Sequence, residues 1–360
     1  MIRFMNLAVT ESERDSLLQV ILQVFNHGIF INGPELTEFE SEISKLHNRK
    51  YANGVCSGSG ALLYALKALG IGMGDEVITT SLSWIATANA IASSGATPIF
   101  ADVDSDLNIN IESIEKLITH KTKAILPVHY AGRVCKIDEV LKLAKENNLK
   151  VLEDASQAIG ASKNGILAGS FGDVSAFSLN PMKVLGALGE AGVVLSDNKE
   201  IKERIDILRY NGTINKESCI TVSLNGRMDT LQASILLERL RTFTNIIEKR
   251  REIAYYYHKH LEDVVKIPLE NEGEKNSWYS YTIMGEDRDY LQKYLLEHGI
   301  ETKIQHPILM PEQIAYKGSK CIIDNAQKIV KQILCIPANE KITKNEQDYI
   351  IERIRRFYGK

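Results

Sequence analysis

The chain has few cysteines, and their spacing excludes the usual cysteine-based sites. Its 360 residues contain five, at positions 56, 135, 219, 321 and 335. The number is odd, the residues are scattered, and no C-x-x-C pair occurs. The pattern therefore predicts neither a disulfide framework nor a zinc site.

The sequence also lacks an excess of positive charge and long apolar runs. Lys and Arg number 43 against 46 Asp and Glu, which gives a net charge of −3. This balance gives no electrostatic reason to expect nucleic acid or an anionic membrane as a partner. No apolar run approaches a membrane span, and residues 2–9 are too short for a signal peptide, so we expect a cytoplasmic protein.

The composition, with 44% hydrophobic and 25% charged residues, is that of an ordinary globular protein, and the chain is long enough for two domains. Short apolar runs alternate with helical patterns from about residue 54 to 197. Strands are predicted over 77–80, 97–101, 124–129, 151–154, 174–178 and 192–196, and helices over 59–69, 84–94, 111–118 and 137–147. The last two strands are close enough to form an antiparallel pair. The alternation predicts the α/β class, with a mainly parallel sheet between helices.

The pattern changes beyond residue 198. Helices are predicted over 228–243, 244–264, 322–333 and 344–357, with a strand-like run over 278–284. We interpret residues 1–242 as a large domain with an N-terminal segment, and 243–360 as a smaller α+β C-terminal domain.

Asp154 and Lys183 are the most informative pair. Asp154 closes a predicted strand, and Lys183 lies on a loop after a later strand. Carboxyl ends of parallel strands form the ligand-binding edge of such sheets. A lysine amine forms a Schiff base with the aldehyde of pyridoxal 5′-phosphate (PLP), and a carboxylate keeps the pyridine nitrogen protonated. A structural Asp and a surface Lys are the alternative.

Other residues near this edge fit a phosphate and a ring. Cys56-Ser57-Gly58-Ser59-Gly60 opens a helix with small residues, and Ser178 ends a strand, so both are candidate phosphate ligands. Trp84 is a candidate for stacking on a pyridine ring, with a core tryptophan as the alternative. Gln157 is placed to bind a ring hydroxyl.

Several segments in order along the chain resemble the DegT/StrS sugar aminotransferases, a family of fold-type I PLP-dependent enzymes. They include Gly33-Pro34-Glu35, Ser57-Gly58-Ser59-Gly60-Ala61-Leu62, Gly74-Asp75-Glu76-Val77-Ile78, Glu153-Asp154-Ala155-Ser156-Gln157, Phe177-Ser178, Lys183-Val184-Leu185-Gly186 and Asn225-Gly226-Arg227-Met228-Asp229.

The resemblance implies a fold-type I PLP-dependent transferase that works as a homodimer with shared active sites. It implies Lys183 and Asp154 as catalytic residues. The cofactor-binding residues that it implies are Gly58, Ser59, Trp84, Asp154, Gln157, Ser178, Lys183 and, from the neighbouring subunit, Asn225. It implies Asn180, Arg227 and His306 as residues facing substrate.

The resemblance also implies glutamate or glutamine as amino donor and a nucleotide-linked keto-sugar as acceptor, in the biosynthesis of amino sugars for surface polysaccharide. Many relatives have Ile-His-Tyr-Pro where this chain has Ile304-Gln305-His306-Pro307. That departure keeps a small phosphorylated ketone, such as dihydroxyacetone phosphate, as an alternative acceptor. A non-catalytic PLP-binding regulatory protein is the alternative of another class.

Overall fold

The computed structural model describes residues 1–267 and 269–360. Its α-helices are α1 (Glu11–His27), α2 (Pro34–Leu46), α3 (Gly58–Ala68), α4 (Ala86–Ser94), α5 (Ile111–Leu117), α6 (Ile137–Glu146), α7 (Lys199–Arg209), α8 (Thr230–Leu240), α9 (Phe243–Leu261), α10 (Arg288–Glu297), α11 (Asp324–Ile329) and α12 (Lys344–Phe357). Short 3₁₀ turns are η1 (Tyr130–Gly132), η2 (Met310–Glu312) and η3 (Ile314–Tyr316).

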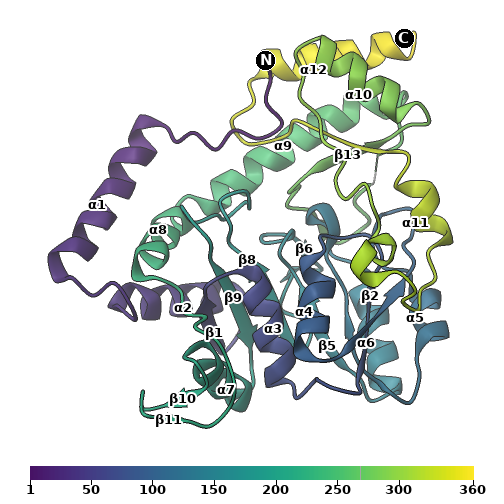
Figure 1. Ribbon diagram of the computed structural model, residues 1–360. Coiled ribbons are helices and arrows are strands. Elements are labelled where there is room, and N and C mark those ends of the chain that lie inside the picture. The colour runs from purple at the N-terminus through teal and green to yellow at the C-terminus, as the bar shows by residue number, and fades with distance from the viewer. Residues whose placement is uncertain (268) are drawn as a thin grey trace.

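A seven-stranded sheet forms the centre of the molecule, in the order β1-β9-β8-β5-β4-β2-β3 (Figure 1). Its strands are β1 (Tyr51–Val55), β2 (Glu76–Thr80), β3 (Thr97–Ala101), β4 (Thr122–Leu126), β5 (Lys150–Asp154), β8 (Val174–Ser178) and β9 (Gly192–Ser196). In this sheet β9 runs antiparallel to β1 and β8, and all the other neighbouring strands are parallel. The predicted mainly parallel sheet and the predicted β8–β9 pair are therefore confirmed.

Side chains alternate between the two faces of a strand, so this sheet has one hydrophobic cluster on each face. One cluster joins Ile78, Ile125, Val151, Phe177 and Val193 of the strands to buried residues of α2, α5, α6 and α8. The other joins Val77, Ala124, Leu152, Ala176 and Val194 to buried residues of α3, α4 and α7. The face that a strand residue occupies therefore follows from its position along the strand.

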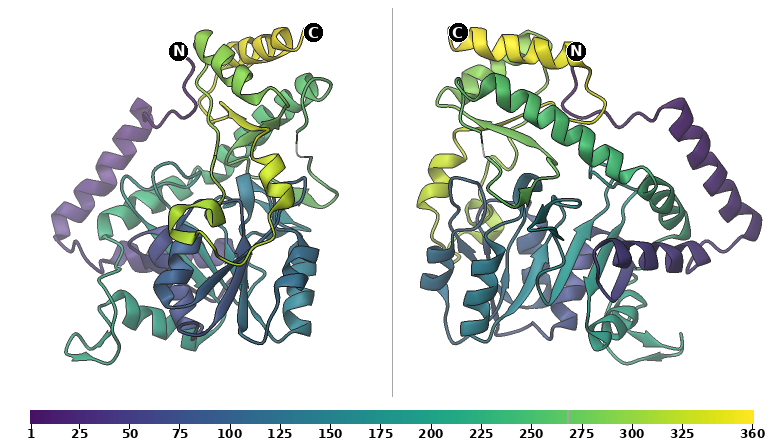
Figure 2. Two further views of the ribbon diagram at one scale, coloured as in Figure 1. Left: turned by 45° about the vertical axis from the view of Figure 1, so that its right-hand side comes forward. Right: turned by 180° about the vertical axis from the view of Figure 1, so that it is seen from behind.

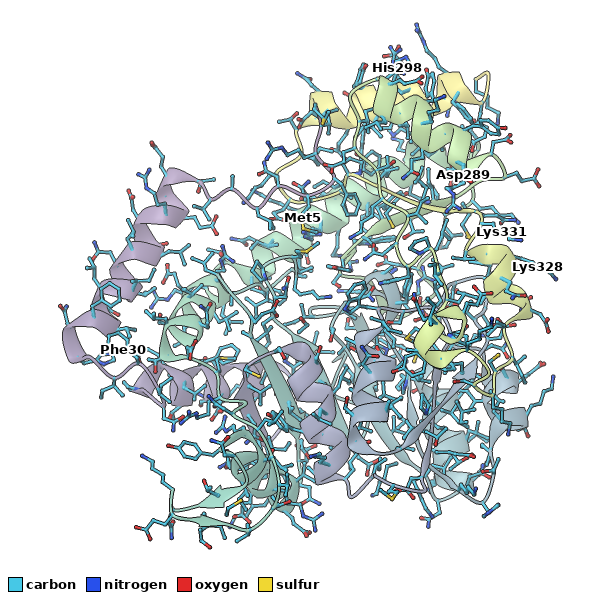
Figure 3. All side chains as sticks on the ribbon, in the orientation of Figure 1. Met5, Phe30, Asp289, His298, Lys328 and Lys331 are labelled. Carbon is cyan, nitrogen blue, oxygen red and sulfur yellow. The ribbon has the colours of Figure 1, made fainter. Side chains whose placement is uncertain are left out.

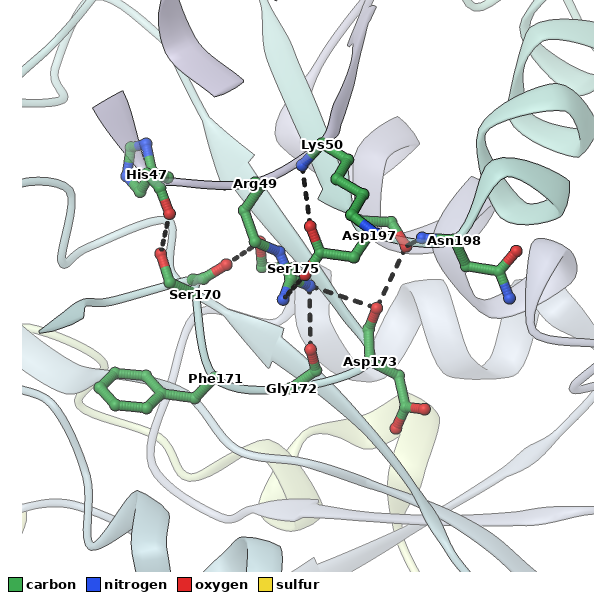
Figure 4. A network of polar contacts seen from close by, with 12 residues as sticks. His47, Arg49, Lys50, Ser170, Phe171, Gly172, Asp173, Ser175, Asp197 and Asn198 are labelled. Atoms are coloured by element: carbon green, nitrogen blue, oxygen red, sulfur yellow. Dashed lines mark hydrogen bonds and ion pairs between the residues drawn. The ribbon is translucent and has the colours of Figure 1, made fainter. Parts of the chain in front are cut away.

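The N-terminal helices and β1 were absent from the sequence prediction. Helix α2 begins at Pro34, a favourable first helical residue, and α1 lies beside α8 at the edge of the molecule (Figures 1 and 2). After α2, the Arg49 guanidinium donates to the Asp197 carboxylate and to the carbonyl of Gly172 (Figure 4). These bonds attach the start of β1 to the turns beside β8 and β9, at the sheet edge opposite the site described below.

The C-terminal region, residues 243–360, builds its own cluster from α9, α10, α12 and the strands β13 (Tyr281–Met284) and β14 (Ile333–Ile336). The first turn of α9 packs instead, through Phe243 and Ile247, on the cluster of the central sheet that contains Ile78. The N- and C-termini both lie beside α12 (Figure 2). The division into two domains at residues 242 and 243 stays a prediction.

Two predicted elements in this region are wrong in extent. The helix predicted over 322–333 is only α11, because Ile333 begins the fully buried strand β14. Trp278 lies outside β13 and has a φ of 50°, a left-handed conformation that is unusual for a bulky residue. Two further small sheets complete the described chain. One pairs β10 (Thr213–Ile214) with β11 (Ser218–Cys219), and the other contains β6 (Ser162–Lys163), β7 (Ile166–Leu167) and β12 (Glu274–Lys275). Among the helices of the described residues, none is long and apolar enough to cross a membrane.

Candidate active site

Asp154 lies at the carboxyl end of β5, on the face covered by α3 and α4. It shares this face with Leu152, two residues earlier on the strand. The carboxylate is 4% exposed, accepts a hydrogen bond from the Thr87 hydroxyl at 2.8 Å and accepts another from the Ser156 N–H at 3.1 Å. It forms no ion pair within the described part of the chain. A buried carboxylate without a counter-charge is costly, so a cationic group at its free side would stabilise it.

The N-terminus of α3 and the end of β8 meet beside this carboxylate. A Cβ atom at Gly58 would lie 2.5 Å from Cβ of Ser178, so only glycine permits this approach. The Ser57 hydroxyl caps α3 by accepting from the Gly60 N–H at 3.1 Å. Within the described residues, the N–H groups of Gly58 and Ser59 donate no hydrogen bond. Two free N–H groups at a helix start, next to a serine hydroxyl, form a suitable cradle for a phosphate.

Lys183 lies on the compact turn that follows β8. Its backbone N–H donates to the carbonyl of Asn180 at 2.8 Å, which closes the turn. The Lys183 Nζ lies 4.5 Å from the ring centroid of Tyr279, and it forms no ion pair among the residues that the structure describes. Asn180 has structural contacts, since its Oδ1 accepts from the Met182 N–H and its Nδ2 donates to Glu190 at 2.6 Å.

Trp84 and His306 lie next to each other, with ring centroids 6.2 Å apart. Trp84 precedes α4, which begins two residues later than predicted, and its 63% exposure excludes the alternative of a core tryptophan. The Tyr130 hydroxyl lies 3.2 Å from His306 Nδ1. Burial, together with the positive charges of Lys183 and Lys303, lowers the pKa of His306 to about 3. The imidazole is therefore neutral at neutral pH.

Gln157 is buried between Asp154 and η1. Its Oε1 accepts from the Ala131 N–H at 3.0 Å, so its NH₂ group remains available to donate. The neighbouring Glu153 points to the opposite face of the sheet, where it pairs with the buried His129 at 2.8 Å and accepts from the backbone N–H groups of a turn. Strand alternation thus separates two adjacent carboxylates, and only Asp154 faces the cradle.

Asn225 and Arg227 lie on a segment beside the start of the cradle, since Cys56 N–H donates to the carbonyl of Gly226 at 2.8 Å. Asn225 Oδ1 accepts from Arg227 Nε at 2.8 Å, and the guanidinium lies 4.5 Å from the Tyr210 ring centroid. Asn225 does not cap a helix, because α8 begins at Thr230 with Asp229 at the cap position.

A groove of the described chain lies away from these residues. Its volume is about 1220 Å³, and its lining includes Asp104, His258 and Lys266 but none of the predicted site residues. A smaller groove of about 340 Å³ is lined by Ser59, Trp84 and Asn89. Of these two grooves, only the smaller one adjoins the cradle, through Ser59. The chemical groups, and not the size of a groove, therefore mark the site.

The residues fit PLP. The cradle suits its phosphate, the unpaired Asp154 carboxylate suits a protonated ring nitrogen, and Lys183 Nζ is free to attach the aldehyde. Gln157 can donate to the ring hydroxyl, and Trp84 offers an exposed indole face.

Comparison with known proteins identifies the family. Residues 11–355 match the model of the DegT/DnrJ/EryC1/StrS aminotransferase family. The chain belongs to this family.

Individual relatives cover almost the whole chain. A pleiotropic regulatory protein from Geobacillus stearothermophilus is 35% identical over 97% of this chain and 96% of its own length. The dTDP-3-amino-3,6-dideoxy-α-D-galactopyranose transaminase from Aneurinibacillus thermoaerophilus is 34% identical, with 99% of both chains covered.

Solved structures agree with these relatives. A family aminotransferase from Brucella abortus matches with a TM-score of 0.96 and 31% identity over 100% of both chains. NtdA from Bacillus subtilis, solved with bound cofactor PMP, matches with a TM-score of 0.93 and 31% identity over 100% of this chain and 85% of that chain. The chain is a PLP-dependent aminotransferase of fold type I.

The sequence reasoning missed two side chains in this aminotransferase site. The Thr87 hydroxyl donates to Asp154. The sequence indicated this contact only weakly, because Thr87 is a hydroxyl residue in the first turn of the helix after Trp84. Tyr279 contacts Lys183 from the C-terminal region, and no local pattern indicated that neighbour.

Proposed function

We propose that this aminotransferase moves an amino group from glutamate or glutamine to a keto group of a nucleotide-linked keto-sugar. The proposal is carried by the Gly58–Ser178 cradle beside the buried Asp154 carboxylate, with Lys183 on the turn that follows β8, in a chain 34% identical to a dTDP-sugar transaminase. That relative's substrate supports a nucleotide-sugar acceptor over a small keto-phosphate. Biosynthesis of amino sugars for surface polysaccharide, in the cytoplasm, is the corresponding role.

In the proposed mechanism, bound PLP carries the amino group and accepts the electron pair left when a carbon loses its proton. Lys183 would attach the cofactor, and its free amine would move a proton between the two neighbouring carbons. Asp154 would hold a proton on the ring nitrogen, and Thr87 fixes the orientation of the carboxylate. The N–H groups of Gly58 and Ser59 would bind the phosphate together with the Ser178 hydroxyl.

Substrate would enter beside Trp84. Asn180, Arg227 and His306 are the proposed substrate-facing residues. A neutral His306 would donate or accept a hydrogen bond without adding charge. Arg227 is suited to an anionic group such as a nucleotide phosphate.

We further propose a homodimer in which Asn225 reaches the cofactor of the partner subunit. Large apolar side chains on and after α1 support an interface there, since Leu22, Phe25 and Phe30 are 49%, 55% and 47% exposed (Figure 3 labels Phe30).

An acceptor screen tests the substrate class. Purified enzyme loaded with PLP is given glutamate or glutamine and one acceptor at a time, with loss of donor as the readout. Nucleotide-linked 3-keto and 4-keto sugars should support turnover, whereas dihydroxyacetone phosphate should not. Turnover with only the small ketone would overturn the proposed acceptor and leave the aminotransferase assignment intact.

Subunit mixing tests the shared site. Lys183→Ala and Arg227→Ala homodimers should each be inactive. After dissociation and reassociation, a hybrid dimer holds one site with both lesions and one with neither, so part of the activity should return. Demonstrated hybrids without recovered activity would mean that Arg227 serves its own subunit or only the fold.

A further inference from the structure

A small cavity lies at the junction between η1 and the segment that leads into β13. Its volume is about 20 Å³, and residues from both the first 242 positions and the C-terminal region line it. A cavity needs roughly 10–15 Å³ to hold one water molecule, so this one has room for water.

Four buried polar atoms belong to side chains that line this cavity and have no hydrogen-bond partner among the described residues. They are Arg133 Nη2, Asn276 Oδ1, Trp278 Nε1 and Ser280 Oγ. The four side chains are 5%, 2%, 7% and 5% exposed, respectively. Buried polar groups in folded proteins are nearly always paired, with protein or with ordered water, so four such atoms at one cavity indicate a shared partner.

The chemistry of the four atoms matches one water. Arg133 Nη2 and Trp278 Nε1 only donate, Asn276 Oδ1 only accepts, and the Ser280 hydroxyl can accept. A water molecule accepts two hydrogen bonds and donates two, which satisfies the whole set. The Cys335 thiol near Ser280 is a weak partner and leaves the other three atoms unpaired.

Ions fit less well than water. The Arg133 guanidinium would repel a cation. An anion would face the Asn276 oxygen, the lining carboxylate Asp106 and the nearby Glu274, whose Oε2 lies 4.0 Å from Arg133 Nη1.

The cavity is also linked to Lys183 through one residue, Tyr279. Trp278 and Ser280 flank Tyr279, whose ring contacts Lys183 at 4.5 Å. The backbone here is constrained: Trp278 has a φ of 50°, and a Cβ at Gly132 would lie 2.6 Å from the Tyr279 nitrogen. A left-handed tryptophan persists only where the surrounding contacts hold it.

We propose that one buried water bridges Arg133, Asn276, Trp278 and Ser280, and that it positions Tyr279 against Lys183. The water site itself stands on the cavity and its unpaired atoms. Its consequence for the cofactor rests on the proposed role of Lys183. Tyr279 then acts as a positioning residue, because an aromatic face stabilises a positive charge on the lysine nitrogen.

A crystal structure of the PLP-loaded enzyme tests the water directly. We expect one density peak within hydrogen-bond distance, about 2.7–3.2 Å, of all four atoms. A cavity without density, or side chains turned to pair with one another, would overturn the site whether or not the enzyme is active.

Absorbance titration tests the positioning of Tyr279. Trp278→Phe keeps an aromatic ring but removes the donor to the water, and Ser280→Ala is a milder second variant. Both should lower the pH midpoint at which the visible absorbance of lysine-linked PLP changes. Complete removal of the ring by Tyr279→Leu should lower this midpoint by about 0.4–0.7 pH units, the shift that a cation–π contact supports.

Ser218→Ala is the matched control, because Ser218 is an exposed residue on β11. Its midpoint should equal that of the wild type. An unchanged midpoint in Trp278→Phe and Ser280→Ala, beside a lowered one in Tyr279→Leu, would refute positioning by the water. A wild-type protein that shows no lysine-linked absorbance would instead refute the role of Lys183.

Discussion

The sharpest prediction concerns the phosphate cradle and the substitution Gly58→Ala. The added Cβ would lie 2.5 Å from Ser178 Cβ and 2.8 Å from Ser178 Cα, whereas ordinary contacts begin at 3.4 Å. The helix start and the strand end must therefore separate by about 0.9 Å, the difference between 3.4 and 2.5 Å. Overpacking of this kind costs about 1–3 kcal/mol, which exceeds the roughly 1 kcal/mol that alanine contributes over glycine in a helix.

The larger effect should be on cofactor affinity. The same displacement moves the N–H groups of Gly58 and Ser59 away from a phosphate held at Ser178. Hydrogen bonds to a charged group contribute about 1.5–3 kcal/mol each, so weakening one should raise the Kd for PLP about tenfold or more. The assay is PLP titration of the cofactor-free protein, followed by absorbance, with thermal unfolding of the same samples.

Gly60→Ala is the matched control in the same helix turn. Its Cβ would lie 3.3 Å from Cys56 Sγ and 3.4 Å from Ser57 Oγ, both of them side-chain atoms, and its N–H already donates to Ser57. It should keep the PLP affinity and raise the melting temperature slightly. Equal affinity and equal stability of the two variants would refute the reasoning about the cradle.

Three further predictions address other residues. Thr87→Val keeps the shape but removes the bond to Asp154, which should lower PLP affinity and turnover by about tenfold, and equal kinetics would show that this bond is dispensable. Lys183→Ala should abolish both the lysine-linked absorbance and turnover while far-UV circular dichroism stays unchanged, and retained turnover would exclude the assigned lysine. Burial lowers the pKa of His47 from 6.5 to about 4, so the unfolded chain binds a proton between these pH values that the folded chain does not. The contribution of neutral His47 to the free energy of unfolding, up to about 3 kcal/mol, is thus present above pH 6.5 and lost as the pH falls to 4. His47→Leu should flatten the dependence of this free energy on pH, measured by urea unfolding. An unchanged pH dependence would contradict the lowered pKa.

Local patterns determined the sheet and the residues at its carboxyl edge. β8 and β9 have the predicted bounds because each is a short run with an apolar centre that lies between turns. The placement of Asp154 on the ligand-binding edge follows from its position at the end of a parallel strand. The position of Lys183 on the next loop follows in the same way.

The extents of elements that depend on distant contacts could not be predicted. The boundary between the helix ending at Ile329 and the strand beginning at Ile333 is one such case, because the pairing of β14 with the distant strand β13 fixes where the strand begins. Helix α1 likewise has little apolar surface buried within its own subunit, with Leu17 and Val24 as its buried residues.

The tertiary structure alone decided what surrounds the site. Glu153 and Asp154 are neighbours in sequence. Only the packing of the sheet against its covering helices brings Glu153 into contact with His129 and Asp154 into contact with Thr87. Tyr279 lies in another region of the sequence and reaches Lys183 only because the segment before β13 packs on η1. The physical reason is that the hydrophobic pattern of a strand or helix is local and periodic, whereas the partner of a side chain depends on which elements pack together.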